Sequence, residues 1–72
     1  MNKPKNKELF QLLDAGYSVE LWKGPHGHTY INLKREGFFS NQLIGMPGEG
    51  RPTRQGKMTK FLKRIIRENN IE

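Results

Sequence analysis

Near the start of the chain, hydrophobic side chains recur at the spacing of a helix. Three leucines fall on one face of such a helix: Leu9, Leu12 and Leu13. Asn6 is a favourable N-cap residue, and Gly16 follows the last periodic position, where a glycine readily adopts the left-handed backbone that closes a helix. The pattern therefore predicts a first helix over Asn6 to Ala15.

After Gly16 the hydrophobic residues alternate with polar ones, which is typical of strands with one buried face. The first alternating run contains Tyr17, Val19 and Leu21, and the second contains Thr29, Ile31 and Leu33. Between them, Gly24-Pro25-His26-Gly27 predicts a tight turn, so the two runs form a hairpin. The polar turn Lys34–Gly37 leads to a less regular third strand, Phe38–Ile44. We expect a three-stranded antiparallel meander.

The segment Gly45–Gly56 is rich in Gly and Pro, which predicts a loop that carries Arg51 and Arg54. A last apolar stripe at three- and four-residue spacing predicts a second helix, Lys57–Glu68; it comprises Met58, Phe61, Leu62, Ile65 and Ile66. The expected fold is α+β, in the order α-β-β-β-α, with two helices on one face of the sheet. We expect a single domain over residues 6–72 behind a disordered basic tail, residues 1–5.

The composition of these 72 residues excludes several classes of protein. A chain of this length builds one thin core, and the absence of cysteine excludes a disulfide framework and a thiolate metal site. The apolar runs are far shorter than the roughly 20 residues that cross a bilayer. The residues that follow Met1 do not form the continuous apolar stretch that is typical of a signal peptide. We therefore expect a cytoplasmic protein without a membrane partner.

Positive charge gathers toward the C-terminus. The chain has 13 Lys and Arg against 7 Asp and Glu, a formal net charge of +6, and most of that excess follows Gly50. Such clustering attracts polyanions, most commonly nucleic acid, although a solvated helix surface is equally compatible with charge alone. The candidate residues for binding RNA or DNA are Lys23, Arg51, Arg54, Lys57, Lys60, Lys63, Arg64 and Arg67.

The two histidines, His26 and His28, lie together in the first turn. A histidine exchanges protons near neutral pH, so His26 is a candidate general acid or base for RNA cleavage, with possible support from Lys23 and His28. The alternative is that His26 is only a turn residue. Two histidines without a neighbouring acid are too few ligands for a zinc site, so we expect no metal.

Other kinds of site are not indicated by the sequence. No paired carboxylates and no phosphate-binding loop motif occur, so we expect no cofactor. Four aromatic residues could stack nucleobases if they face outward, but packing is the commoner role in a chain with so little core material; they are Trp22, Tyr30, Phe38 and Phe39.

Several short motifs, taken in order, resemble the HicA (YcfA-like) mRNA interferase toxins. The motifs are Leu12-Leu13-Asp14-Ala15-Gly16-Tyr17, Lys23-Gly24-Pro25-His26, a Pro-containing loop, and the ending Leu62-Lys63-Arg64-Ile65-Ile66-Arg67-Glu68-Asn69-Asn70-Ile71. The resemblance spans most of Glu8 to Ile71. It implies a double-stranded-RNA-binding-like fold, a metal-independent endoribonuclease whose essential histidine is His26, and a HicB-like antitoxin as protein partner.

The chain also departs from the pattern of that family. Pro25 replaces a small polar residue, Gly27 stands where a polar residue is frequent, and the loop after the third strand has no histidine. These departures concern cleavage more than fold. Two alternatives to a ribonuclease therefore stay open: a non-catalytic nucleic-acid-binding domain, and a small protein-interaction or inhibitor module.

Overall fold

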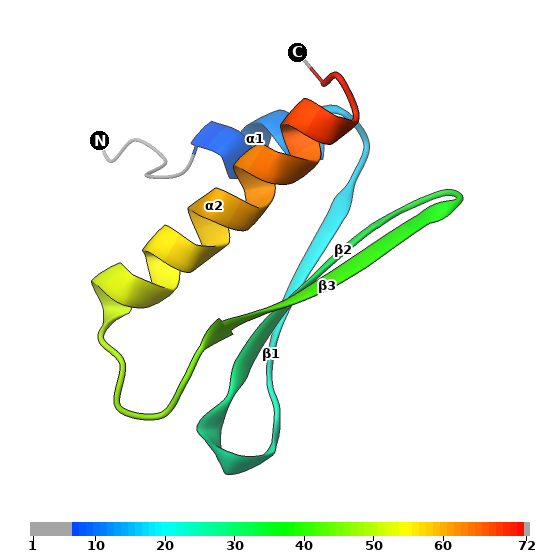
Figure 1. Ribbon diagram of the computed structural model, residues 1–72. Helices are drawn as coiled ribbons and strands as arrows, with labels where there is room; N and C mark the ends of the chain where they lie inside the picture. Colours follow the sequence, from blue (N-terminus) through cyan, green and yellow to red (C-terminus); the bar gives the residue numbers. More distant parts are fainter. Residues whose placement is uncertain (1–6, 72) are drawn as a thin grey trace, which may run out of the picture.

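The computed structural model describes residues 7–71 and contains two helices and three strands in the order α-β-β-β-α (Figure 1). The elements are α1 (Lys7–Asp14), β1 (Ser18–Lys23), the short 3-10 turn η1 (Pro25–Gly27), β2 (Thr29–Arg35), β3 (Phe38–Gly45) and α2 (Arg51–Glu68). The strands form one antiparallel sheet with β2 in the centre. The predicted α+β fold and element order are confirmed. The expected tail and the N-cap Asn6 lie outside the described residues.

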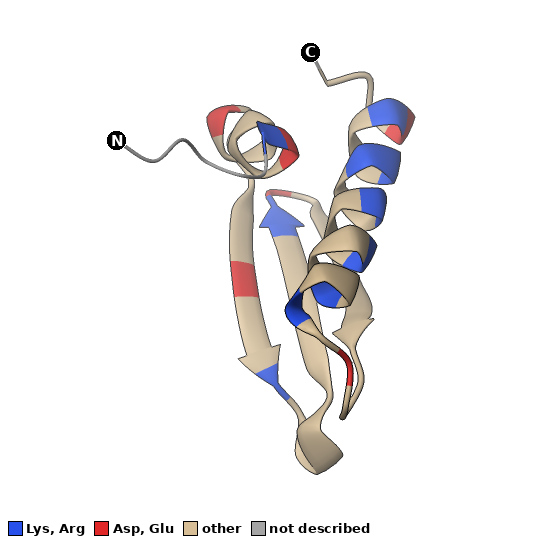
Figure 2. Ribbon diagram, turned by 90° about the vertical axis from the view of Figure 1, so that its left-hand side faces the viewer, with Lys and Arg blue, Asp and Glu red and all other residues tan. Residues whose placement is uncertain are grey.

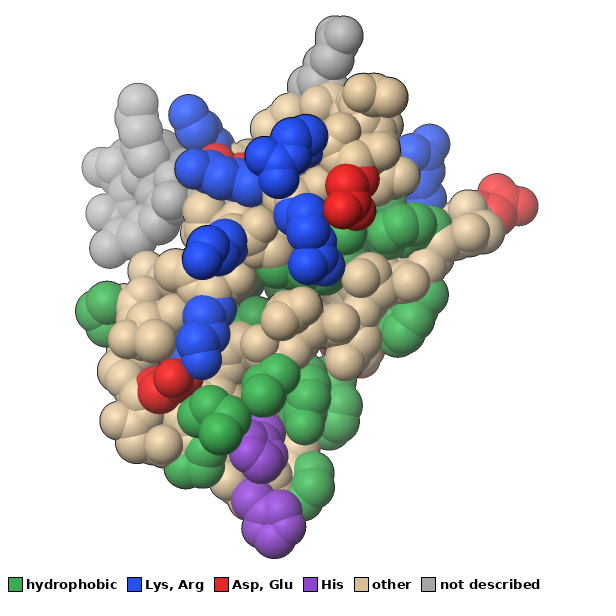
Figure 3. Space-filling model, in the orientation of Figure 1, with side chains coloured by type: hydrophobic (Ala, Val, Ile, Leu, Met, Phe, Trp, Pro, Cys, Tyr) green, Lys and Arg blue, Asp and Glu red, His purple; other side chains and the backbone are tan. Residues whose placement is uncertain are grey.

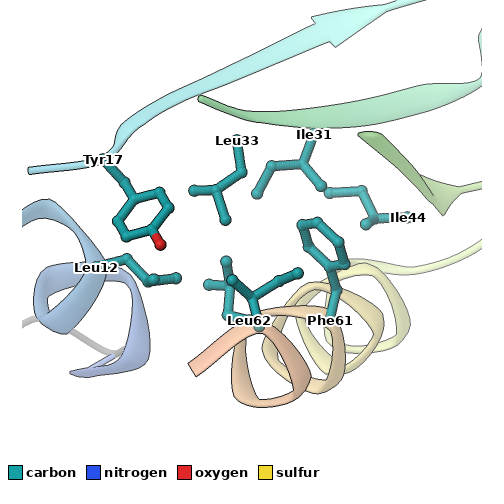
Figure 4. Close-up of a cluster of buried hydrophobic side chains, with 8 residues drawn as sticks. Leu12, Tyr17, Ile31, Leu33, Ile44, Phe61 and Leu62 are labelled. Atoms are coloured by element: carbon teal, nitrogen blue, oxygen red, sulfur yellow. The ribbon is translucent and has the colours of Figure 1, made fainter. Parts of the chain in front are cut away.

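Both helices pack on the same face of the sheet, where the alternation of the strands directs their apolar residues. Ile31 and Leu33 of β2 are fully buried and meet Leu12 of α1 and Leu62 of α2 (Figure 4). The remaining buried apolar side chains complete this core; they are Tyr17, Ile44, Phe61 and Ile65. No helix of the described residues lies on the opposite face of the sheet (Figure 1), which we call the open face.

The end of α1 follows the sequence prediction within one residue. Gly16 adopts a φ of +97°, and the Tyr17 N–H donates to the Leu12 carbonyl at 3.1 Å. Glycine adopts this left-handed backbone conformation readily because it has no Cβ, and it ends the helix so that the chain can enter β1. The second predicted turn is present but shorter than expected, because Lys34 and Arg35 belong to β2 and only Glu36 and Gly37, the latter with a φ of +77°, connect β2 to β3.

The start of the second helix was predicted wrongly. The segment Gly45–Gly56 does not form a loop, because α2 begins at Arg51 and only five residues separate it from β3. Pro52 lies in the first turn of α2, where its missing N–H costs no helical hydrogen bond. Gly56 is an interior helix residue with open space around it. Arg51 and Arg54 are therefore held by a helix.

Leu21 also differs from its expected place in the core. Its strand partner is the buried Ile31, so it faces the helices, yet 57% of its surface is exposed. Leu21 is exposed because β1 is an edge strand and α2 packs mainly on β3.

Within residues 7–71, no helix has the length and apolar character needed to cross a membrane.

Candidate nucleic-acid interface

The most basic element of the described chain is α2, with seven Lys and Arg and one acidic residue, Glu68. Figure 2 shows basic residues on successive turns of this helix. Four of them follow each other at spacings of three, four and three residues, so they form one stripe; these are Lys57, Lys60, Arg64 and Arg67. The stripe lies beside β3, which brings the predicted cations of one helix face together.

A hollow of about 480 Å³ separates this stripe from β3, and we call it the α2 groove. The lining residues of the α2 groove are Gln42, Leu43, Lys57, Lys60, Phe61, Arg64 and Arg67. In Figure 3, Lys and Arg side chains form a band along this side of the molecule. Sequence reasoning found the cations but missed Gln42, Leu43 and Phe61, because their part in the groove depends on how α2 packs against β3.

The positive charge of the α2 groove is largely uncompensated. Within residues 7–71 the single ion pair joins Lys57 Nζ to Glu49 Oε2 at 2.9 Å. The Arg64 guanidinium lies over the Phe61 ring, 5.5 Å from its centroid, which fixes it at the wall of the groove. Lys60, Arg64 and Arg67 have no carboxylate partner in the described part of the chain, so their charge is available to a ligand.

Glu49 connects the segment before α2 to the helix. Its carboxylate accepts hydrogen bonds from Lys57 Nζ at 2.9 Å and from the Met46 N–H at 2.8 Å. The hydrogen bond from Lys57 and then that from the Met46 N–H lower the pKa of Glu49 below its ordinary value of 4.5. A single carboxylate thus orients the first cation of the α2 groove and closes the turn after β3.

The structure separates Arg51 and Arg54 from this stripe. The Arg54 side chain crosses Gly45 so closely that a Cβ added there would lie 2.5 Å from Arg54 Cδ. Its Nε is buried and has no hydrogen-bond partner among residues 7–71. Both arginines line a second hollow, with Leu21, Thr29, Ile44, Gln55 and Met58. Lys63 lines neither of these hollows.

His26 lies at the tip of the turn between β1 and β2. Its backbone is left-handed, with a φ of 63° and a ψ of 22°, and its side chain is exposed. The turn is closed by a hydrogen bond from the Gly24 N–H to the His28 carbonyl at 2.7 Å. Lys23, also exposed, ends β1 beside this turn and pairs with Thr29.

The histidines continue a row of aromatic rings. The His26 and His28 ring centroids are 6.4 Å apart, and those of His28 and Tyr30 are 6.3 Å apart. Tyr30 stacks on Trp22 with a centroid distance of 4.7 Å and an angle of 18°. Trp22 is nevertheless 42% exposed, so these rings pack on one another outside the core.

The other two aromatic candidates divide between core and solvent. Phe38 packs edge-on against Tyr17 at 5.6 Å, whereas Phe39 is 61% exposed on the open face. Beside them, the open face carries a polar ladder that sequence reasoning missed. Asn41 Nδ2 donates to Asn32 Oδ1 at 2.6 Å, and Asn32 Nδ2 donates to Glu20 Oε1 at 3.2 Å. The alternation of the strands, read together with their register, would have revealed it.

The histidine turn and the α2 groove are distinct regions of the surface. Figure 3 shows the two histidines at the lower end of the molecule, with hydrophobic side chains between them and the band of Lys and Arg. The structure therefore brings His26 and His28 together, but not His26 and the cations of α2. In the part of the chain that the structure describes, no three His, Cys, Asp or Glu side chains gather in a way that could hold a metal ion.

Comparison with known proteins finds no family model, no curated protein and no solved structure that matches this chain.

Proposed function

We propose that this protein binds RNA through the α2 groove and acts in the cytoplasm. The observation that carries the proposal is the stripe of Lys57, Lys60, Arg64 and Arg67, which lines one groove and, within residues 7–71, has only one ion pair among its four cations. Phosphate groups are the ligands that such a stripe attracts most strongly. The resemblance to HicA toxins favours RNA over DNA as the target.

The geometry of α2 suits a phosphate backbone. Residues three or four positions apart on a helix rise by about 4.5–6 Å along its axis, so successive cations can meet successive phosphates. Arg64 and Arg67 offer planar guanidinium groups for bidentate contacts, whereas Lys60 offers a point charge. Binding of this kind depends on charge more than on base sequence.

A second candidate function, RNA cleavage, is favoured by the proximity of His26 to His28. In the proposed reaction one imidazole takes the proton of a ribose 2′-hydroxyl, whose oxygen then attacks the adjacent phosphorus. The bond from phosphorus to the 5′-oxygen breaks, and the other imidazole donates a proton to that leaving oxygen. The products are a 2′,3′-cyclic phosphate and a free 5′-hydroxyl, and Lys23 would balance charge on the phosphate.

This second function would make the protein a HicA-like mRNA interferase toxin. A HicB-like antitoxin would then be its protein partner, and the α2 groove would hold the substrate while the histidine turn cuts it. The distance between the two regions requires an RNA long enough to reach from one to the other. A long single strand is therefore the appropriate substrate for a test.

The test compares four proteins on a long single-stranded RNA in EDTA at neutral pH, with retention and cleavage followed on gels. The proteins are the parent, Arg64→Glu, the charge-matched control Lys34→Glu on β2, and His26→Ala. We expect Arg64→Glu to weaken RNA binding by about tenfold, while Lys34→Glu, which alters a cation outside the groove, retains most of the affinity. Equal weakening by both charge reversals would refute the groove as the binding site.

Cleavage is judged separately from binding. If the second function holds, the parent cuts the RNA and His26→Ala does not, although it still binds, because an exposed turn residue contributes little to the core. RNA that stays intact with the parent, or is cut equally by His26→Ala, removes the catalytic role of His26 and leaves the binding function standing.

A further inference from the structure

The outer edge of β3 is open to pairing with another strand. In the sheet order β1-β2-β3, no strand within residues 7–71 lies beyond β3. An edge strand directs alternate N–H and C=O groups away from its sheet, and folded proteins usually protect such edges with charged residues or proline. β3 has eight residues and none of these protecting types, whereas β1 carries Glu20 and Lys23.

The register also leaves most of this edge regular. From Phe38 to Leu43 each residue of β3 faces one residue of β2, and the irregularity in the pairing lies at the far end, opposite Thr29 and Tyr30. A regularly paired stretch of about six residues is long enough for a typical added strand. The edge is therefore a usable template for backbone hydrogen bonds.

The α2 groove runs beside this edge. Gln42 and Leu43 belong to β3 and line the groove, and the opposite wall is built by the cations of α2. A strand added to β3 would therefore lie within reach of Lys60, Arg64 and Arg67. Phe61 supplies apolar surface beside the charges, whereas Leu43 pairs with Tyr30 and therefore directs its side chain to the open face.

The charges decide which strand can occupy the edge. Antiparallel pairing of two copies of this chain through β3 would bring the cations of both α2 helices toward the same junction, and like charges there oppose association. RNA complements the cations, but it has no peptide groups to satisfy the alternating donors and acceptors of β3. An acidic polypeptide in extended conformation satisfies both features at once.

We propose that the outer edge of β3 and the α2 groove together form a docking site for an extended acidic peptide segment, which adds to the sheet as a fourth strand. Acidic residues at every second position face Lys60, Arg64 and Arg67, and main-chain hydrogen bonds to β3 set the register. Because the same cations are proposed to bind RNA, the peptide and RNA compete for the groove, but peptide docking itself does not depend on RNA binding.

The test uses a synthetic peptide of about eight residues that alternates Glu with Val and Thr, a length that matches an ordinary strand. Two control peptides carry N-methyl groups on one or the other alternate set of amides, so each keeps the charge but loses half of its backbone donors. Binding to the parent protein is measured by calorimetry, and amide hydrogen exchange of the protein shows where the peptide lies.

We expect the unmodified peptide to bind and to slow exchange in β3, and at least one N-methylated peptide to bind about tenfold or more weakly. Arg64→Glu should weaken peptide binding by a similar factor, whereas Lys34→Glu on β2, outside the groove, should change affinity by no more than about threefold. Circular dichroism confirms that both variants are folded, and the N-methylated peptides require no protein variant.

Several results would overturn the proposal. Equal binding of all three peptides would show attraction by charge alone, and protection at β1 instead of β3 would place the strand at the wrong edge. The proposal would also be overturned if the unmodified peptide did not bind, or if the free protein formed a dimer held by its β3 edge. Protection of β3 by a short RNA, but not by the peptide, would overturn it as well.

Discussion

At the scale of the residue, Glu49 shows how one side chain positions the basic helix. It lies in the five-residue connection between β3 and α2 and receives hydrogen bonds from both sides, from the Met46 N–H and from Lys57. This arrangement fixes Lys57 at one end of the α2 groove. The Glu49 carboxylate also partly neutralises the charge of Lys57, so the other three cations of the stripe are expected to dominate RNA binding.

Titration of Glu49 should reveal these contacts. Because its pKa is lowered in the folded protein, the carboxylate stabilises the fold above about pH 4.5, and this contribution is lost as the pH falls through the lower folded pKa. In Lys57→Met the hydrogen bond that contributes most to the lowered pKa of Glu49 is lost. The carboxyl resonance of Glu49, followed by NMR, should therefore titrate at higher pH than in the parent. An unchanged midpoint would mean that the hydrogen bond to Lys57 does not form in solution.

Gly24 is a second residue whose identity is set by its neighbours. A Cβ at this position would lie 2.7 Å from Tyr30 Cε1 and 3.3 Å from Trp22 Cζ3, although the backbone conformation, with a φ of −87°, suits any residue. Gly24→Ala should therefore disturb the stack of Trp22 on Tyr30 and lower the free energy of unfolding by about 1–2 kcal/mol.

The matched control for Gly24→Ala is Gly50→Ala, where the nearest atom is Pro52 Cδ at an ordinary 3.6 Å. Trp22 is the only tryptophan of the chain, so its fluorescence spectrum reports the stack directly. A spectrum and a stability that are unchanged in Gly24→Ala would contradict the close approach of these rings.

At the scale of the element, α2 determines both the core and the candidate interface. Its apolar stripe places Phe61, Leu62 and Ile65 on the sheet, and its basic stripe lies about a third of a turn away, beside β3. Because the helix begins at Arg51, it has eighteen residues and holds all seven cations on one rigid scaffold.

Gly56→Ala tests this longer helix. Apart from the neighbouring backbone of α2, nothing in residues 7–71 lies within 4 Å of the added methyl group, and alanine is favoured over glycine in a helix interior. The free energy of unfolding should therefore rise by about 0.5–1 kcal/mol. Thermal or denaturant unfolding measures the change. If residues 51–56 were an irregular loop in solution, the substitution would leave stability unchanged or reduce it.

Much of this fold could be predicted from the sequence, because local signals agreed with the tertiary structure. Gly16 marked the end of α1, and the alternation through Ile31 and Leu33 identified the buried face of β2. The start of α2 could not be predicted in the same way. The local preference of six Gly and Pro residues for a loop was overridden by the proline-compatible first turn and by the packing of Arg54 on Gly45.

The candidate interface was only partly predictable. Helical spacing places Lys57, Lys60, Arg64 and Arg67 on one side of α2, but only tertiary packing puts that side next to Gln42 and Leu43. The separation of His26 from the stripe also depends on the three-dimensional arrangement.

At the scale of the whole molecule, the surface divides into three regions of different chemistry. The α2 groove is basic, the open face carries the polar ladder and the exposed Phe39, and the turn between β1 and β2 carries the two histidines. An RNA bound along α2 therefore contacts the basic side chains of the groove. Only an RNA long enough to continue around the molecule would also reach His26.

The salt dependence of RNA binding tests the central claim most directly. Affinity for a fluorescent single-stranded RNA is measured by anisotropy between low and moderate salt, for the parent and for Lys60→Gln combined with Arg64→Gln. If Lys60, Arg64 and Arg67 each meet one phosphate, the logarithm of the association constant should fall with the logarithm of salt concentration with a slope of about −2, and the double variant should bring it to about −0.7. Binding that ignores salt, or a slope that the double variant leaves unchanged, would contradict recognition of RNA by the α2 groove.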